Sequence, residues 1–340
     1  MVDLSTNYAG LTLRNPLVVS ASPLCKEIGN LRRMEDAGAA AIVLHSLFEE
    51  QINIESNELD KYLWHSADVS AEATNYYPNL ENFSIGPDAY LEHIRKAKEA
   101  VSIPIFGSLN GVSEGGWVGY AKLMEDAGAD GIELNIYFLA TDGQEDSAAV
   151  EAQYVHLVQA LRVQLKVPLT VKIGPYFSSM TNFAKRLDAA GANALVIFNR
   201  FYQPDFDIAT LEVAPSLELS RISELSLRLH WAAVLFGRIK ADIAITGGVH
   251  SSTDVIKSMM AGARVAMTTS AMIESGIGVL GSMLTGLEGW MEKNFYQSIR
   301  QMQGSMSQQN VANPAAFNRA NYMKVLSSYA LRDLAAQGTK

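Results

Sequence analysis

The sequence MEDAGAAAIVL at residues 34–44 recurs in altered form along the chain. It reads MEDAGADGIEL at 124–134, LDAAGANALVI at 187–197 and, shortened, MMAGARVAM at 259–267. Each copy joins the end of a helix, an Ala-Gly-Ala turn and an apolar run, and glycine suits this turn because it accepts a positive φ without a Cβ clash. The run that follows is continuously apolar, as in a parallel strand covered on both faces. The repeat therefore indicates an α/β protein.

Further apolar runs of the same kind complete a set of eight predicted strands. They lie at 16–22, 40–46, 103–109, 131–137, 168–174, 194–199, 242–248 and 265–270. Helical patterns separate most of them, for example at 115–128 and 180–191. Eight strands with intervening helices predict a (β/α)8 TIM barrel. The alternative is a doubly wound sheet, but no GxGxxG motif follows the first strand, which counts against it.

The whole chain, 1–340, is expected to form a single domain. The length beyond a minimal barrel lies in two insertions, 47–102 after the second strand and 200–241 after the sixth. Segments that follow barrel strands lie at the C-terminal mouth, where active sites of this fold are built. Residues 294–340 are expected to form a C-terminal helical extension that packs on the barrel exterior or on a partner.

Composition narrows the classes of function. Hydrophobic residues make up 48% of the chain, enough for a large core, and the formal net charge of −9 disfavours nucleic-acid and anionic-membrane partners. The single cysteine excludes an internal disulfide and a cysteine-cage metal site, and we expect no metal. The start MVDLSTNYAG lacks the features of a signal peptide, and the apolar runs are too short to span a bilayer. These features predict a cytoplasmic location.

Polar residues gather at the predicted strand ends, which converge at the barrel mouth. Lys172 lies within PLTVKIGP, and a lysine among such apolar neighbours requires an anionic or electron-rich partner. Two partners stay open, an internal salt bridge with Glu133 or a bound cofactor or substrate. The TGG at 246–248 and the TTS at 268–270 end the seventh and eighth strands, the usual phosphate site of this fold.

These segments resemble the class 1 dihydroorotate dehydrogenases, a family of FMN-containing barrels. The similarity covers roughly residues 1–300. It rests on NPLVVSAS (15–22), AGAAAIVLHS (37–46), YPN (77–79), AGADGIELNI (127–136), PLTVKIGPYF (168–177) and ITGGVHSSTDVIKSMMAGA (245–263).

The resemblance implies FMN as cofactor and a pyrimidine-like small molecule as substrate. It implies that Lys172 contacts the flavin and supports negative charge on the reduced ring. The other implied cofactor-binding residues are Ala21, Ser22, His45, Ser46 and Asn135 near the ring, and Gly247, Gly248, Thr269 and Ser270 at the phosphate. The implied substrate-binding residues are Asn75, Asn135 and Asn199.

The chain also departs from the family's pattern. His45 stands where the family has a lysine, Pro23 where it usually has a glycine, and Thr269 replaces a glycine of the phosphate turn. Phe138 aligns with the family's cysteine or serine base and cannot take a proton. Cys25, Tyr137 and His45 are the alternative candidates for a base.

Two readings of the function follow from the resemblance. The first is an FMN-dependent oxidoreductase acting on CH–CH donors, which oxidises dihydroorotate or a related small ring in pyrimidine metabolism. The alternative is a flavin- or ligand-binding barrel that has lost the base and has another substrate or no turnover. A phosphosugar-handling barrel without flavin is a third, weaker hypothesis. The family likeness also suggests a homodimer, for which residues 217–236 offer an apolar surface. The alternative is that these residues cover the barrel mouth and complete each monomer.

Overall fold

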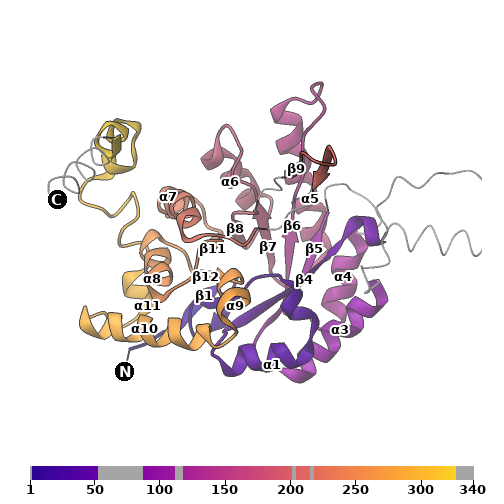
Figure 1. Cartoon of the computed structure of the whole chain (residues 1–340), viewed down its shortest axis with the longest axis horizontal. Coiled ribbons are helices and arrows are strands. Elements are labelled where there is room, and N and C mark those ends of the chain that lie inside the picture. Colours follow the sequence, from indigo (N-terminus) through magenta and orange to yellow (C-terminus); the bar gives the residue numbers. More distant parts are fainter. Residues whose placement is uncertain (1, 53–86, 112–117, 201–203, 215–217, 327–340) are drawn as a thin grey trace, which may run out of the picture.

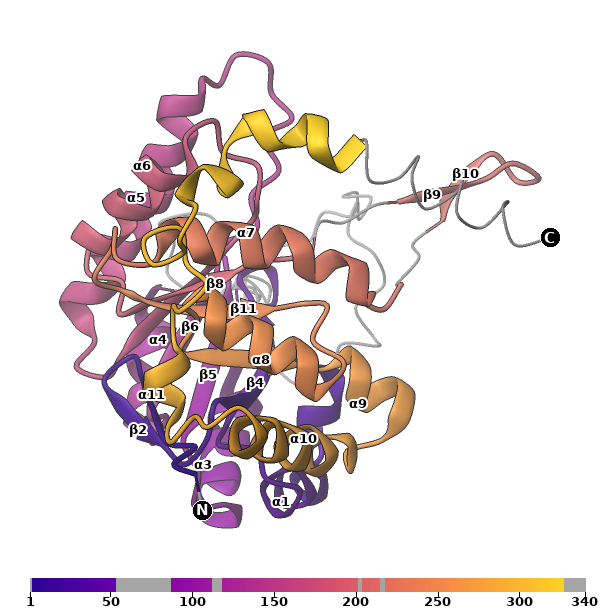
Figure 2. The ribbon, with the colours of Figure 1, turned by 90° about the vertical axis from the view of Figure 1, so that its left-hand side faces the viewer.

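The computed structural model of the chain describes residues 2–52, 87–111, 118–200, 204–214 and 218–326. In these residues, parallel strands close into a barrel in the order β11-β12-β3-β4-β5-β6-β7-β8. Helices surround the barrel (Figures 1 and 2). The predicted TIM barrel is confirmed, and every barrel strand overlaps its predicted range. The barrel strands are β3 (Leu17–Val19), β4 (Ala41–Phe48), β5 (Ile105–Asn110), β6 (Gly131–Asn135), β7 (Leu169–Ile173), β8 (Ala194–Ile197), β11 (Asp242–Thr246) and β12 (Val265–Thr268).

The helices fall between these strands and after the last one. The α-helices are α1 (Ile28–Asp36), α3 (Pro87–Ala100), α4 (Val118–Asp126), α5 (Ser147–Gln164), α6 (Met180–Ala189), α7 (Leu225–Leu235), α8 (Ser252–Ala261), α9 (Ser270–Ser275), α10 (Val279–Lys293) and α11 (Ile299–Met302). The short 3-10 turns are η1 (Pro23–Lys26), η3 (Ile222–Glu224), η4 (Pro314–Phe317) and η5 (Arg319–Asn321).

The repeated Ala-Gly-Ala turns have the conformation that the sequence requires of them. They follow α1, α4, α6 and α8, and their glycines (Gly38, Gly128, Gly191 and Gly262) all have φ between +103° and +115°. A Cβ on Gly262 would lie 2.4 Å from the ring of Phe236, so this turn also needs the close approach that only glycine allows. Each turn sends the chain from an outer helix into the next barrel strand.

A short N-terminal hairpin lies at the end of the barrel opposite to the mouth. It pairs β1 (Thr6–Tyr8) with β2 (Leu11–Leu13). The buried ring of Tyr8 enters the barrel interior with its centroid 6.0 Å from that of Phe106. Ala9 N–H donates a hydrogen bond to Asp242, the first residue of β11. The hairpin therefore closes the end at which the strands begin and leaves the other end for a ligand.

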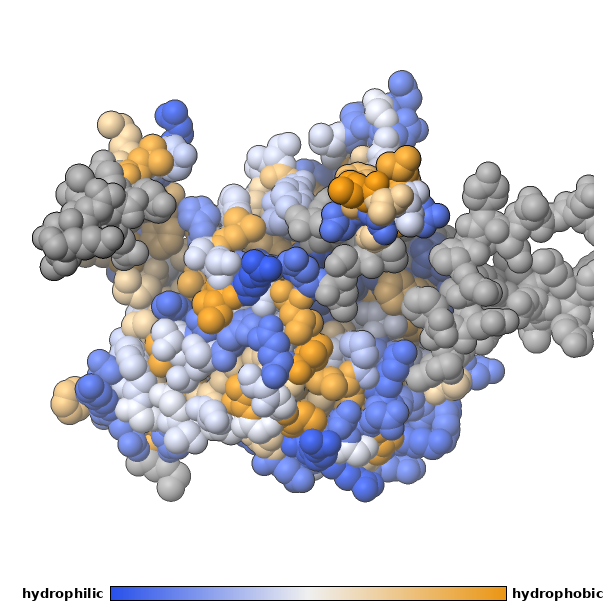
Figure 3. All heavy atoms as spheres, viewed as in Figure 1, coloured by the Kyte–Doolittle hydropathy of each residue, from blue (hydrophilic) through white to orange (hydrophobic). Residues whose placement is uncertain are grey.

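The segment after β8 contains a second hairpin, formed by β9 (Asp205–Asp207) and β10 (Glu212–Ala214). It projects from the barrel, and apolar atoms gather on it in the space-filling view (Figure 3). Four large apolar side chains on it are 57–89% exposed, namely Phe206, Ile208, Leu211 and Val213. The sequence analysis did not single out this hairpin.

The apolar stretch predicted as a docking surface, residues 217–236, forms η3 and α7 in its described part. Much of its apolar surface packs on the chain's own barrel, since Leu225, Ala232, Ala233 and Leu235 are buried. Ile222 and Leu227 stay exposed, at 58% and 43%. This helix completes the barrel wall, as α1, α4 and α6 do elsewhere.

The C-terminal extension packs on the barrel exterior in its first part. Ile299 and Met302 are fully buried. Backbone hydrogen bonds join Gly304 N to Met259 O and Gln308 N to Ala233 O, which fixes the segment on α8 and α7. Residues 322–326 are helical, and the rest of the predicted terminal helix lies outside the described residues. No described helix is long and apolar enough to cross a membrane.

Candidate active site

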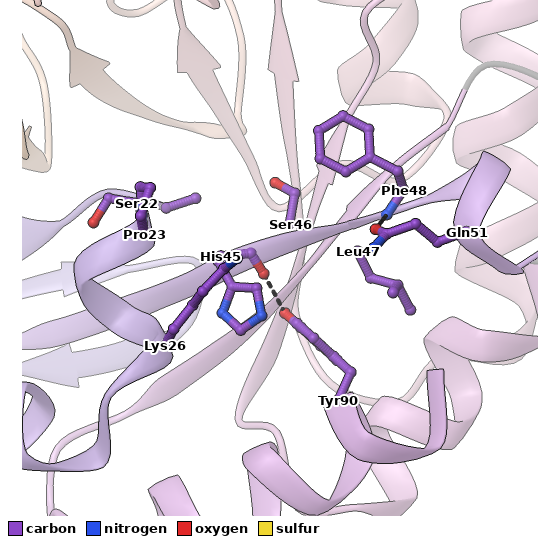
Figure 4. Close-up of a pocket in the computed structure, with 10 residues that line it drawn as sticks. Ser22, Pro23, Lys26, His45, Ser46, Leu47, Phe48, Gln51 and Tyr90 are labelled. Atoms are coloured by element: carbon purple, nitrogen blue, oxygen red, sulfur yellow. Dashed lines mark hydrogen bonds between the residues drawn. The ribbon is translucent and has the colours of Figure 1, made fainter. Parts of the chain in front are cut away.

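The mouth of the barrel contains a cavity of about 260 Å³ between the ends of β3 and β4 (Figure 4). It is lined by Ala21, Ser22, Pro23, Lys26, His45, Ser46, Leu47, Phe48, Gln51 and Tyr90. We call this the β4 cavity. The structure thus brings together Ala21, Ser22, His45 and Ser46, four of the residues that the sequence analysis assigned to a cofactor.

His45 is held firmly in the wall of the β4 cavity. Its ring packs against the rings of Tyr90 and His93, at centroid distances of 5.0 and 5.3 Å. The Tyr90 hydroxyl donates a hydrogen bond of 2.8 Å to the backbone carbonyl of His45 (Figure 4). Burial, followed by the nearby charges of His93 and Lys26, lowers the pKa of His45 to about 4. The imidazole is therefore neutral at pH 7.

A second cavity, of about 130 Å³, lies at the ends of β7, β8, β11 and β12. We call it the β11 cavity. Its lining includes Lys172, Thr246, Gly247, Thr269 and Ser270, and it shares Ala21 with the β4 cavity. The glycine-containing end of β11 and the hydroxyl-containing end of β12, which the sequence predicted as a phosphate site, are thus adjacent in the fold.

The glycines at the end of β11 are required by their surroundings. Gly247 and Gly248 have φ of +88° and +81°. A Cβ on Gly247 would lie 2.8 Å from the Arg228 guanidinium, and one on Gly248 would lie 2.6 Å from the backbone N of Leu225. Neither position accepts a side chain without a shift of the backbone or of a buried arginine. The Gly247–Gly248 turn therefore presents backbone atoms rather than side chains, and we call it the glycine cradle.

Hydroxyl groups surround this cradle. Ser270 Oγ accepts hydrogen bonds from the backbone N–H of Ser220 at 3.0 Å and is 2.9 Å from Ser220 Oγ. Gly248 N–H donates to Ser220 Oγ at 3.3 Å, and Thr269 Oγ1 donates to the carbonyl of Ser20 at 3.0 Å. Sequence reasoning missed Ser220, which lies far from any motif and reaches the cradle only because the chain before α7 crosses the mouth.

Two arginines near the cradle were also missed. Arg228 on α7 is 5% exposed and donates from Nε to the carbonyl of Thr246 at 2.7 Å. Its guanidinium lies 3.4 Å from Glu224, and that of Arg200 lies 3.8 Å from the same carboxylate. A charged residue within the apolar run LSLRLHWAAVL was the available signal for Arg228.

Lys172 contacts one of the two partners that the sequence left open, Glu133, and it lines the cavity where the other could bind. Its Nζ lies 3.8 Å from Glu133 Oε1, and Glu133 is 1% exposed. Burial raises the pKa of Glu133 above its ordinary value, and the positive charge of Lys172 opposes this rise. Lys172 also lines the β11 cavity. One lysine thus lies between a buried carboxyl group and the β11 cavity.

The predicted substrate asparagines lie at the ends of β6 and β8. Asn199 uses its amide N–H groups within the fold, donating to the carbonyls of Ile136 at 3.1 Å and Lys172 at 3.4 Å. Asn135 Oδ1 is buried without a hydrogen-bond partner among the described residues. Asn199 lines a third cavity of about 370 Å³, together with Tyr176, Arg200 and Arg221. Asn75 lies outside the described residues.

The candidates for a base differ in their access to these cavities. Phe138, at the aligned position, is partly buried against the core. Cys25 is fully buried, and this burial raises the pKa of its thiol to about 11. Of Cys25, Tyr137 and His45, His45 alone lines one of these three cavities. No group of three or more His, Cys, Asp or Glu within the described part of the chain is placed to hold a metal ion.

The chain is similar to known proteins over most of its length. A family model described as dihydroorotate dehydrogenase matches residues 3–291. The chain is 25% identical to the catalytic subunit of dihydroorotate dehydrogenase B (NAD(+)) of Thermoplasma acidophilum, over 89% of this chain and 99% of the relative. It is 27% identical to a putative dihydroorotate dehydrogenase A (fumarate) of Aeropyrum pernix, over 89% and 97%. It is 23% identical to dihydroorotate dehydrogenase A (fumarate) of Lactococcus lactis, over 89% and 99%.

Proposed function

Because the chain belongs to the dihydroorotate dehydrogenase family, we propose that it is an FMN-dependent oxidoreductase that acts on a CH–CH bond of dihydroorotate or a related ring in pyrimidine biosynthesis. One observation carries the proposal. A glycine cradle, its hydroxyl groups and Lys172 line one cavity at the barrel mouth. This is the set of groups that a phosphorylated, electron-accepting ring requires.

The residues at the mouth fit FMN. The Gly247–Gly248 turn leaves no room for side chains, and Ser270 and Thr269 add hydroxyl groups beside it. Arg228 places a buried positive charge against the same turn, which favours a phosphate. These residues would hold the phosphate, while Ala21, Ser22, His45, Ser46, Asn135 and Lys172 would hold the ring. When bound, FMN would supply a ring that accepts a hydride from a substrate C–H bond.

The chain's own side chains would then orient the substrate and stabilise charge. Lys172 would stabilise the negative charge that the ring takes up on reduction, since it lies at the cavity with its ammonium partly buried. Asn135 would offer a ring N–H group its buried carbonyl oxygen, which has no hydrogen-bond partner among the described residues. Asn199 would act as an acceptor, because its N–H groups are engaged by backbone carbonyls. Asn75, which lies outside the described residues, is proposed as a third residue that binds the substrate.

We further propose a cytoplasmic homodimer. The four exposed apolar side chains of the β9–β10 hairpin favour burial against another surface. These side chains are a stronger candidate for the dimer interface than residues 217–236, which pack largely on the barrel of their own chain.

The proposal is tested on the purified protein. We expect a yellow protein with a flavin absorption spectrum that releases FMN, identified by mass, on denaturation. Dihydroorotate added without oxygen should bleach the flavin band. A colourless protein that binds no added FMN would contradict the cofactor. An FMN protein whose spectrum is perturbed by orotate but never bleached would favour the alternative of a ligand-binding barrel without turnover.

A further inference from the structure

Glu133 lies in the interior of the barrel on β6, and the proposed function leaves it without a role. The residue is 1% exposed, so its carboxylate is shielded from solvent. Its Oε2 atom has no hydrogen-bond partner among the described residues. Its neighbours in the sheet, Ser108 on β5 and Thr170 on β7, are uncharged. An ionised carboxylate in such surroundings requires a cation nearby, because burial disfavours the charged form.

Lys172 is the one cation within ion-pair distance of Glu133 in the described part of the chain, at 3.8 Å. Two hydroxyl groups also face Glu133, those of Tyr8 on β1 and Tyr90 on α3. Burial raises the pKa of both hydroxyls, and the negative charge of Glu133 adds to the rise. Both hydroxyls are therefore neutral at pH 7, and the charge of Glu133 is balanced by Lys172 alone.

Reduction of a ring bound at the β11 cavity would change this balance. Lys172 lines that cavity and, in the proposed function, stabilises the negative charge that the ring takes up. One ammonium group would then face two negative charges. Like charges in a site of low dielectric constant are relieved when a carboxylate among them takes up a proton. Burial already raises the pKa of Glu133 and the charge of Lys172 opposes this rise, so a second anion beside Lys172 favours the protonated carboxyl group.

We propose that Glu133, a positioning residue that acts through Lys172, takes up one proton when the flavin ring is reduced. This inference rests on the proposed function and adds a residue that does not itself touch the cofactor. A hydride brings two electrons and one proton to the ring, which gains one negative charge. A second proton, from solvent in the cavity, forms an O–H bond on Glu133, and Lys172 lies on its path. The ring and the carboxyl group together therefore keep the same total charge.

The experiment measures the midpoint potential of the FMN-loaded protein between about pH 5 and 9. For a two-electron couple, each proton taken up makes the potential fall by about 30 mV per pH unit. The parent should show a range of pH with about twice this slope, because the ring and Glu133 each take up a proton. Glu133→Gln, which keeps the shape of the side chain and cannot take up a proton, should show the single-proton slope over the same range.

Two control variants separate Glu133 from other groups that could take up the proton. Glu292→Gln removes an exposed carboxylate of α10 and should keep the slope of the parent. His45→Gln should keep it as well, and loss of the steep range in that variant would contradict the inference. The absorption spectrum of the reduced flavin is recorded at each pH. A spectral change that follows the steep range would show that the ring itself binds the second proton, which would also contradict the inference.

Infrared spectroscopy tests the same point on the parent protein, which avoids dependence on the folding of a variant. The difference spectrum between the reduced and the oxidised protein should contain a new band of a protonated carboxyl group. This band should shift in D2O and be absent from Glu133→Gln.

Equal single-proton slopes in the parent and in Glu133→Gln would overturn the inference, as would the lack of a carboxyl band on reduction of the parent. Both results would leave the FMN assignment intact, because the protein would still hold a flavin with a measurable potential. A protein that binds no FMN would instead refute the proposed function, and the inference with it.

Discussion

Lys172 on β7 and Glu133 on β6 form a buried pair directly beneath the barrel mouth, with 3.8 Å between Lys172 Nζ and Glu133 Oε1. The neighbouring strands place Asn135 opposite Lys172 and Glu133 opposite Thr170. Since side chains of a strand alternate between its faces, Glu133 and Asn135 point to the same side. A single lysine thus links a buried carboxyl group with the proposed flavin.

Glu133→Gln should raise the midpoint potential of the bound flavin. The substitution removes the negative charge that faces Lys172, so the ammonium stabilises the charge of the reduced ring more strongly. A shift on the order of 30 mV is expected, since 30 mV corresponds to about 1.4 kcal/mol for a two-electron couple. Redox titration against indicator dyes measures it. Glu92→Gln, at an exposed carboxylate of α3, is the control, and an unchanged potential in Glu133→Gln would contradict the coupling.

Gly248→Asp should abolish FMN retention. Its side chain would collide with the backbone of Leu225 and place a negative charge in the cradle. The flavin-to-protein ratio after gel filtration measures retention, and circular dichroism checks that the variant folds. Gly119→Asp on α4, where a Cβ meets nothing within 4 Å, is the control. A folded Gly248→Asp protein with one FMN per chain would show that the phosphate lies elsewhere.

Flavin reduction by dihydroorotate should be slow near neutral pH. A positioned general base commonly contributes about 10²–10⁴-fold to the rate, and Phe138 occupies the aligned position. Stopped-flow measurement without oxygen gives the rate, and Phe138→Cys should increase it. Rapid reduction by the parent would show that another residue takes the proton. His45→Gln would then be the first variant to make, ahead of Cys25→Ser, because His45 lines a cavity and the Cys25 thiol is buried with a raised pKa.

His45 should make the protein less stable as the pH falls. Its pKa is about 4 in the fold, against an ordinary value of 6.5 for histidine. The contribution to stability is complete above pH 6.5 and is lost as the pH falls toward 4, because the unfolded chain takes up the proton first. The full effect is about 3 kcal/mol.

Urea unfolding of the parent and of His45→Gln, between pH 7 and 4, isolates this contribution from other titrating groups, among them His93. As the pH falls, the free energy of unfolding of the parent should decrease relative to that of His45→Gln. A difference that stays constant over this range would show that His45 titrates normally in the folded state.

Phe206→Ser together with Leu211→Ser should convert a dimer to a monomer. Both side chains are exposed on the β9–β10 hairpin, at 70% and 89%. Sedimentation velocity at micromolar concentration measures the change. Val163→Ser, at an 89% exposed apolar residue of α5, is the matched control. A parent protein that sediments as a monomer would end the dimer proposal.

The sequence was sufficient to predict the barrel and the location of its mouth. The Ala-Gly-Ala repeat determines both, because a helix end, a turn of positive φ and a buried strand are properties of neighbouring residues. The glycines of 246–248 and the hydroxyls of 268–270 also predict a phosphate site from local sequence. That prediction needs only the knowledge that they end the seventh and eighth strands.

Contacts between distant residues were decided by the tertiary structure. Whether Lys172 meets Glu133 or a ligand could not be settled from spacing, since it depends on the register of β6 against β7. The approach of Arg228 to Gly247, the position of Ser220 and the presence of Lys26 and His45 at one cavity have no local signature in the sequence. Periodicity and turn chemistry act over a few residues, so the sequence by itself determines which elements form and in what order. Side chains from separate elements meet only when the barrel closes, and closure therefore determines the charge and hydrogen bonding of the site.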